Sequence, residues 1–138
     1  MHVQVVTPEK TLVDEEVDEI VVPTVTGEIA VLPNHVPLVT QIAPGELILK
    51  SHGKNEFFAI VGGFLEVSGK NVSILADYAV HGNDVSVVNA EEARARAEKA
   101  MKEHKSGEDF ALAQGEFLKA IAELKVAKRL KHTSTLPK

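Results

Sequence analysis

The sequence contains no cysteine and no tryptophan among its 138 residues, and aromatic residues make up only 4% of it. The absence of cysteine excludes a disulfide framework and a cysteine-based metal site. No apolar run approaches the roughly 18–20 residues that a helix needs to cross a bilayer. The opening ten residues also lack the basic and then apolar stretches of a secretory signal. We therefore expect a cytosolic chain, any membrane link of which runs through a partner.

Recognisable catalytic and ligand-binding motifs are missing too. The sequence has no GxSxG motif and no glycine-rich phosphate loop, and its six histidines are scattered without a metal-ligand spacing. The acidic run at 14–19 is interpreted as a solvated strand edge that discourages unwanted strand pairing, rather than as a cation site. By elimination we expect a binding or mechanical protein with no catalytic residue, no metal and no cofactor.

The charges are divided unevenly along the chain. Residues 1–88 carry 12 acidic and 4 basic side chains, whereas residues 89–138 carry 8 acidic and 11 basic ones. A change of sign at one point predicts two units that meet different surfaces. The basic half lacks the interleaved aromatics of a nucleic-acid-binding protein, so no nucleic acid is expected as a partner.

The first half of the chain shows the pattern of short β-strands. Its segments are rich in β-branched and aromatic residues, and turn residues such as Gly27 and the pair Pro44-Gly45 separate them. The expected strands are 2–7, 17–23, 36–42, 45–50, 56–67 and 71–77. Many short strands at close spacing predict a sandwich or flattened barrel.

The segment 56–67 holds two further signals. The pair Gly62-Gly63 inside it is interpreted as a bulge or a close approach between backbones. Beyond that pair, Phe64 and Glu66 alternate with Leu65 and Val67. This alternation predicts a half-buried antiparallel strand.

Near residue 88 the period changes to that of helices. Asn89, with Glu92 three residues later, is predicted to cap the first helix, which carries a thin stripe of alanines. A second helix is expected over about 108–131, with Phe110, Ala113, Phe117, Ile121, Leu124 and Leu118 on its apolar side. The predicted fold is therefore α+β, mainly β: an N-terminal antiparallel β-sandwich over 1–88, and then an antiparallel two-helix hairpin with a frayed tail over 89–138.

Five blocks of the sequence together resemble one known family. They are VVTPE at 5–9, GEIAVLPNHVPLVT at 27–40, GGFLEV at 62–67, VSILAD at 72–77 and EDFALAQGEFLKAIAELKVAKRL at 108–130. In this order, and over nearly the whole chain, they resemble the epsilon subunits of bacterial F-type ATP synthases.

This resemblance implies a non-catalytic part of the central stalk of a proton-driven rotary enzyme. The sandwich is expected to bind the gamma subunit and to rest on the c-ring, at the cytoplasmic face of the plasma membrane. The loop at 27–40 would meet the polar loop of the c-ring, with Glu28 as the expected contact. His35 in the same loop is either part of that contact or a packed, hydrogen-bonded loop histidine.

The resemblance also implies that the hairpin moves. In this family it permits turnover when folded against the sandwich, and it blocks ATP hydrolysis when it extends along gamma into the ring of alpha and beta subunits. The basic residues Lys125, Lys128, Arg129 and Lys131 would then face an acidic segment of the beta subunit. The alternative is a solvated face that complements the C-terminal dipole of the helix.

Some members of the family bind ATP between the sandwich and the hairpin. The matching positions here are Val85, Ser86, Asn89, Ala90 and Arg96. Ser86 stands where the family pattern has Asp, and Asn89 stands where it has Arg. Two further arginine positions hold Lys119 and Glu123. Because the base-reading acid and most of the phosphate-pairing guanidinium groups are lost, ATP binding is expected to be weak or absent.

Two other functions remain open from the sequence. A free-standing protein–protein adaptor would be a stable monomer that needs no gamma partner. A nucleotide-sensing module would bind ATP measurably as an isolated chain.

Overall fold

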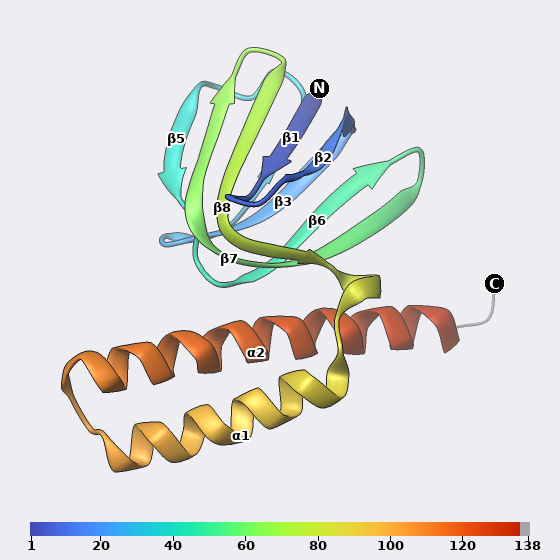
Figure 1. Ribbon diagram of the computed structural model, residues 1–138. Coiled ribbons are helices and arrows are strands. Elements are labelled where there is room, and N and C mark those ends of the chain that lie inside the picture. Colours follow the sequence, from blue (N-terminus) through green and yellow to red (C-terminus); the bar gives the residue numbers. More distant parts are fainter. Residues whose placement is uncertain (136–138) are drawn as a thin grey trace.

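The computed structural model describes the backbone of residues 1–135 and the side chains of residues 1–130. Eight strands are followed by a short 3-10 helix and two α-helices (Figure 1). The strands are β1 (His2–Val6), β2 (Thr11–Glu16), β3 (Glu19–Thr24), β4 (Gly27–Val31), β5 (Leu38–Gln41), β6 (Gly45–Ser51), β7 (Lys54–Ser68) and β8 (Asn71–His81). The helices are η1 (Gly82–Asp84), α1 (Val87–Glu103) and α2 (Gly107–Thr135). A β-sandwich followed by two packed helices confirms the predicted fold class.

Two long strands, β7 and β8, belong to both layers of the sandwich. The first half of β7 pairs with β6 and its second half with β5, while β8 runs antiparallel to β7 along both halves. The first layer therefore holds β2, β1 and β5, together with the end of β7 and the start of β8 on either side of the turn that joins them. The other layer holds β6, β3 and β4 with the opposite ends of the two long strands.

Strand β7 passes from one layer to the other at Gly62 and Gly63. Both glycines have positive φ angles, 69° and 105°. A side chain on Gly63 would overlap the backbone carbonyl oxygen of Leu75 in β8. The pair therefore permits the close backbone approach that was predicted from the sequence.

The apolar core lies between the two layers and follows the alternation of the strands. In the second half of β7, Leu65 and Val67 are buried and Phe64 is exposed, which confirms the predicted half-buried strand. In its first half both faces are covered, because Phe58 packs in the sandwich core whereas Phe57 belongs to a separate cluster with α2. Burial on both faces explains the nearly continuous apolar run in this part of the sequence.

One pair of strands differs from the predicted antiparallel arrangement. Strand β1 lies beside β8 and runs parallel to it, with His2 opposite Asn71 and Val6 opposite Leu75. The sheet is therefore mixed, although every other pairing is antiparallel. Strand β4 was not predicted, because it follows a turn, and β2 was predicted only as an acidic strand edge, without bounds of its own.

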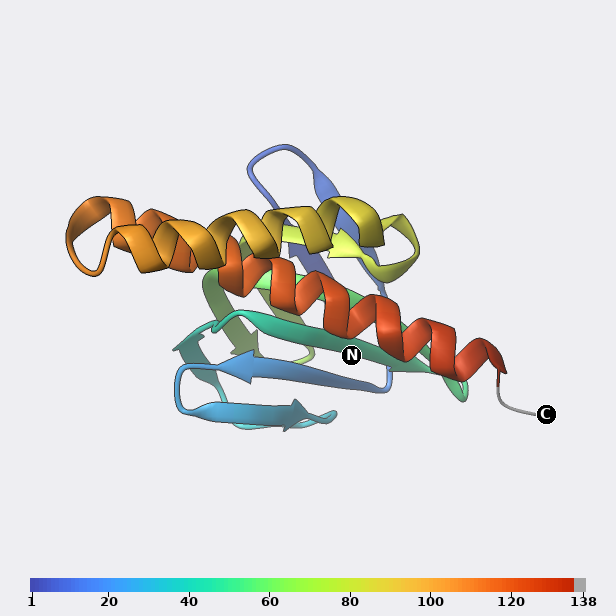
Figure 2. The same ribbon diagram turned by 90° about the horizontal axis from the view of Figure 1, so that it is seen from below.

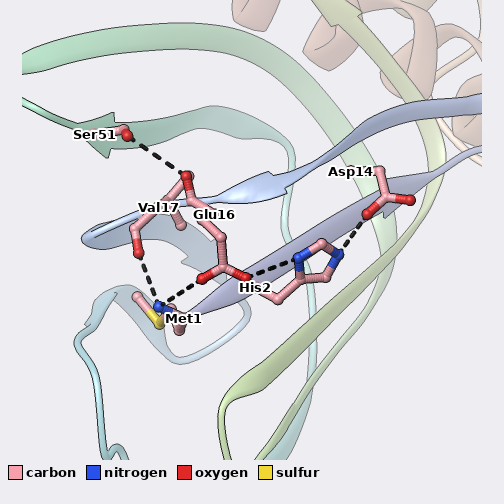
Figure 3. Close-up of polar contacts among 6 residues, drawn as sticks. All are labelled: Met1, His2, Asp14, Glu16, Val17 and Ser51. Carbon is pink, nitrogen blue, oxygen red and sulfur yellow. Dashed lines mark hydrogen bonds and ion pairs between the residues drawn. The ribbon is translucent and has the colours of Figure 1, made fainter.

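The first three acids of the run, Asp14 to Glu16, lie on β2 at an outer edge of the sheet, as predicted, whereas Glu19 lies on β3 between β6 and β4. Figure 3 shows His2 of β1 between two exposed carboxylates of β2: it hydrogen-bonds Asp14, and its Nδ1 lies 3.1 Å from an oxygen of Glu16. The Met1 ammonium lies 3.5 Å from the other Glu16 oxygen. Hydrogen bonds to Asp14 and then Glu16 raise the pKa of His2. These contacts tie the first strand to its neighbour.

Helix α1 begins three residues earlier than predicted. Ser86, not Asn89, is its N-cap, and the Ser86 hydroxyl accepts a hydrogen bond of 3.3 Å from the backbone N–H of Asn89. Both are good capping residues. The turn η1, which ends at Asp84, brings the chain into helical conformation by Val87, so the earlier residue takes the role.

The two helices form a hairpin that is stacked on the sandwich, with α2 between α1 and the sheet (Figures 1 and 2). The predicted alanine stripe of α1 is confirmed, since Ala90 and Ala97 are buried. On α2 the predicted apolar side is confirmed in part: Ala113 is buried and Phe110, Phe117 and Leu124 are half-buried, whereas Ile121 and Leu118 are exposed. Three further side chains of α2 are buried, Ala120, Ala122 and Val126, because a helix covered on two sides needs small residues on both.

Candidate functional site

The segment 27–40, which the family resemblance predicts to meet the c-ring, begins on β4 at the free edge of the layer that holds β6, β3 and β4. Glu28 is exposed on β4, the edge strand, opposite Pro23. His35 is half-buried in the following loop, where its Nδ1 lies 2.8 Å from the carbonyl oxygen of Val36. Val36 itself is 71% exposed. The loop thus presents an acid and an apolar side chain to the surroundings, while His35 is hydrogen-bonded within it.

A second exposed surface lies on the outer face of the first layer. Val39, Phe64 and Leu75 come from β5, β7 and β8 and are each more than half exposed. Phe64 pairs directly with Leu75 across the strands. We call these three residues the sandwich patch. Val39 lies opposite the exposed Glu66, two residues along β7 from Phe64. Large exposed apolar side chains on one face are typical of a surface that another protein covers.

A third feature is the contact between α2 and the sandwich, which we call the seam. Buried Phe57 and Ala59 of β7 pack against Ala122 and Val126 of α2, with Leu130 half-buried beside them. Val126 is the one fully buried large apolar side chain that the described part of α2 contributes. Burying a large apolar side chain is worth about 1.5–3 kcal/mol, so Val126 of α2 and Phe57 of β7 together contribute several kcal/mol to the docked hairpin.

One ion pair stands at the edge of the seam. The Nε–H of Arg129 on α2 donates a hydrogen bond of 2.9 Å to the carboxylate of Glu46 on β6. The Glu46 side chain is 2% exposed and that of Arg129 is 47% exposed. The guanidinium carbon of Arg129 also lies 5.5 Å from the centre of the Phe57 ring. A nearly buried carboxylate therefore has its charge partner on the hairpin.

The described lysines that neighbour Arg129 on α2 are not paired with the sandwich in this way. Lys125 and Lys128 are exposed, and within the described part of the chain neither forms an ion pair. The side chain of Lys131 lies outside the described residues. Of the four residues that were grouped by sequence, the structure thus separates Arg129 from Lys125 and Lys128.

The positions of the degenerate nucleotide pattern line a cleft of about 420 Å³ between β8, η1 and the two helices. Ser86, Asn89, Ala90 and Arg96 line it, and Val85 is not among the lining residues. The remaining walls come from Tyr78, Val80, Asp84, Ala93, Glu116, Lys119 and Glu123. The cleft therefore brings together most of the predicted positions.

A polar network within the protein occupies one wall of this cleft. The Tyr78 hydroxyl donates a hydrogen bond of 3.0 Å to the Glu123 carboxylate, and the Lys119 ammonium lies 4.0 Å from the centre of the Tyr78 ring. Burial raises the pKa of Tyr78, and the Glu123 carboxylate raises it further. The two positions at which the family pattern has arginine are thus engaged with Tyr78, Lys119 with its ring and Glu123 with its hydroxyl.

Sequence reasoning missed Glu46, Tyr78 and Gly82, which all lie at the contact between hairpin and sandwich. Glu46 gave a signal, because it is an acid inside an apolar strand segment. Gly82 gave none, since its role depends on Val126 and Leu130 far along the chain.

Comparison with known proteins gives two family matches, one after the other along the chain. Residues 1–82 match the family described as "ATP synthase, Delta/Epsilon chain, beta-sandwich domain", and residues 84–128 match "ATP synthase, Delta/Epsilon chain, long alpha-helix domain". The ATP synthase epsilon chain of Herpetosiphon aurantiacus is 41% identical over 93% of this chain and 94% of its own length. That of Alkalilimnicola ehrlichii is 36% identical over 95% and 94%.

Solved structures share the fold at lower identity. A chain of the Euglena gracilis mitochondrial ATP synthase, in a structure of its OSCP, F1 and c-ring, superposes with a TM-score of 0.68 at 23% identity, over 96% of this chain and 79% of that one. A chain from the central stalk and c-ring of the Tetrahymena thermophila mitochondrial enzyme gives 0.58 at 14% identity, over 94% of each.

Neither helix of the described chain is both long enough and apolar enough to span a membrane. Both family matches and both bacterial relatives assign the chain to one subunit type, with the sandwich first and the helices second. The chain therefore belongs to the delta/epsilon family of ATP synthase subunits, as an epsilon chain: a non-catalytic subunit of the central stalk of the F-type enzyme.

Proposed function

We propose that this chain couples rotation of the c-ring to ATP synthesis through its sandwich and restrains ATP hydrolysis through its hairpin. The observation that carries the proposal is the small seam, in which Val126 and Phe57 are the buried large side chains and one ion pair joins α2 to the sandwich. A hairpin held by several kcal/mol can change position when another surface compensates the lost contacts, since about 5.5 kcal/mol moves a population from 1:99 to 99:1.

The sandwich offers separate surfaces for two partners. The sandwich patch of Val39, Phe64 and Leu75 is apolar, as the interfaces of permanent complexes are, and we assign it to the gamma subunit. The edge loop with Glu28 and His35 is polar at Glu28, which suits the polar loop of the c-ring. Through these two contacts the subunit would lie peripherally, at the cytoplasmic face of the plasma membrane, with proton flow through the ring as the driving force.

The hairpin offers a third surface when it leaves the sandwich. Extended along gamma, α2 would bring Lys125 and Lys128 toward an acidic surface of the catalytic alpha and beta ring. Both side chains are already exposed in the docked state, so they can make this contact without breaking another one among the described residues. The hairpin would thus act by blocking hydrolysis and not by any chemistry of its own.

The test of this function is assembly with the catalytic subunits. The tagged full chain should co-purify with an alpha, beta and gamma assembly, and it should restore coupled ATP synthesis to membranes that lack it. Phe64→Glu should abolish co-purification, because it places a charge in the sandwich patch.

Leu112→Glu is the matched control, since Leu112 is 70% exposed on α2 and lies outside the sandwich. It should co-purify like the original chain. A free-standing adaptor would remain monomeric in the presence of gamma, and that result would overturn the proposal. Assembly of Phe64→Glu at the original level would remove the assignment of the sandwich patch.

A further inference from the structure

We infer that Arg129 is the latch of the hairpin: it holds α2 on the sandwich through Glu46, and it opposes the inhibitory action of the neighbouring lysines. This inference rests on the proposed movement of the hairpin. Within the basic cluster of α2, Arg129 would favour the docked hairpin, whereas the neighbouring lysines would favour inhibition by the extended one.

The ion pair joins two parts of the chain that are distant in sequence. Glu46 on β6 and Arg129 on α2 are 83 residues apart, and their Oε2 and Nε atoms lie 2.9 Å apart. Because the Glu46 side chain is almost completely buried, it depends on Arg129 to compensate its charge. No other described cation forms an ion pair with Glu46. Losing Arg129 while α2 stays docked would leave a buried carboxylate without its partner.

A glycine makes this close approach possible. Gly82, at the start of η1, is buried where α2 crosses the end of β8. A Cβ atom on Gly82 would lie 2.5 Å from Cδ1 of Leu130 and 2.6 Å from Cγ1 of Val126. These residues flank Arg129 on α2. The ion pair and the tightest packing are therefore at the same end of the helix.

The remaining contacts between α2 and the sandwich stabilise the docked hairpin less. Helix α1 packs on α2, and it is α2 that packs on the sheet. Besides Val126, the buried residue that α2 contributes to the seam is Ala122. An alanine buries little area, so it adds little to the docked state. The end of α2 that carries Val126, Arg129 and Leu130 therefore decides whether the hairpin is docked.

The test is the distance between hairpin and sandwich in the isolated full chain. The sequence has no cysteine, so spin labels at Asn55→Cys and Lys102→Cys, both exposed, report that distance alone. Arg129→Gln should shift the distribution from the docked to the undocked distance, with the docked-to-undocked ratio falling about tenfold. Adding Glu46→Gln to Arg129→Gln should recover docking, because the buried charge is then gone.

Arg94→Gln is the matched control. It removes the same charge from the hairpin, but Arg94 pairs only with Glu98 on its own helix among the described residues, at 3.8 Å. It should leave the distance distribution unchanged. Gly82→Ala provides a second way to undock the hairpin, by steric contact and not by charge, and should shift the distribution in the same direction as Arg129→Gln.

An unchanged distribution in Arg129→Gln overturns the latch, as does an equal shift in Arg94→Gln or the absence of recovery by Glu46→Gln. Hydrolysis by the assembled enzyme separates this from the proposed function. If Arg129→Gln undocks the hairpin but hydrolysis is unchanged, the latch stands and the inhibitory function fails. If it undocks the hairpin and hydrolysis falls, both stand.

Discussion

At the scale of single residues, the cleft beneath β8 is defined by side chains that already have partners inside the protein. The Ser86 hydroxyl caps α1, Lys119 lies over the Tyr78 ring, and Glu123 accepts the Tyr78 hydrogen bond. Glu123 and Glu116 also place negative charge at the cleft. A nucleotide phosphate would meet these carboxylates with Arg96 as the one arginine in the lining.

We therefore predict that the isolated chain binds ATP with a dissociation constant in the millimolar range or weaker. Each missing charge-assisted hydrogen bond costs about 1.5–3 kcal/mol, roughly ten- to a hundredfold in affinity. Titration calorimetry measures it directly. The combined variant Ser86→Asp, Asn89→Arg, Lys119→Arg and Glu123→Arg, which restores the family pattern, should bind more tightly. Micromolar binding by the original chain would contradict the prediction.

At the scale of elements, α2 combines two opposed tasks on one helix. Its end near Arg129 holds the docked state, whereas Lys125 and Lys128 point to solvent and are available to an acidic partner. Exposed ion pairs are worth about 0–1 kcal/mol each and are weakened by salt. The two lysines can therefore bias the hairpin but cannot fix its position.

We predict that Lys125→Ala combined with Lys128→Ala raises ATP hydrolysis by the assembled enzyme about two- to tenfold at low ionic strength, with assembly unaffected. The inhibition by the original chain should fade between about 0.1 M and 1 M salt, as the screening length falls from about 10 Å to about 3 Å. Steady-state hydrolysis across a salt series measures both effects. Hydrolysis that does not change in the double variant would leave these lysines as a solvated face that complements the helix dipole.

Elements with strong local patterns were predictable from the sequence, and those set by tertiary contacts were not. The alternation in β7 and the alanine stripe of α1 follow from side-chain period alone. The choice of Ser86 over Asn89 as N-cap depends on where η1 ends, which is a property of the fold. The exposed Ile121 was mistaken for a core residue because a helix covered on two sides shows no single apolar stripe.

The sequence predicted several of the residues that line the cleft, but it did not predict which side chains contact one another across the hairpin and the sandwich. Most members of the degenerate nucleotide pattern do line one cleft, because the family resemblance fixes their order along the chain. The pairing of Glu46 with Arg129 spans 83 residues and depends on how α2 crosses the sheet. No local pattern of either residue contains that information, so only the structure separates Arg129 from its basic neighbours.

At the scale of the whole molecule, the sandwich has a core of its own that does not require the hairpin. Its cluster runs from Val3 to Ala76, whereas the seam cluster is small and separate. We propose that the chain consists of two units with a boundary near residue 88, as the change in charge and period indicated.

We predict that a fragment of residues 1–88 folds, assembles with gamma and supports coupled ATP synthesis, while regulation of hydrolysis is lost. Removal of α2 exposes Phe57 and Ala59, so the fragment should be less soluble than the full chain. Circular dichroism and co-purification test folding and assembly, and the full chain is the control. An unfolded fragment, or one that fails to assemble, would show that the sandwich depends on the hairpin.

The parallel pairing of β1 with β8 also has a consequence for synthesis on the ribosome. His2 pairs with Asn71 and Val6 with Leu75. The pairing of β1 with β8 therefore cannot form until nearly the whole sandwich has left the exit tunnel. Contacts between segments so distant in sequence slow folding, whereas the helical hairpin forms from local contacts and folds quickly. The nascent chain should therefore acquire its sandwich late and in one cooperative step, at about the time that α2 emerges to cover it.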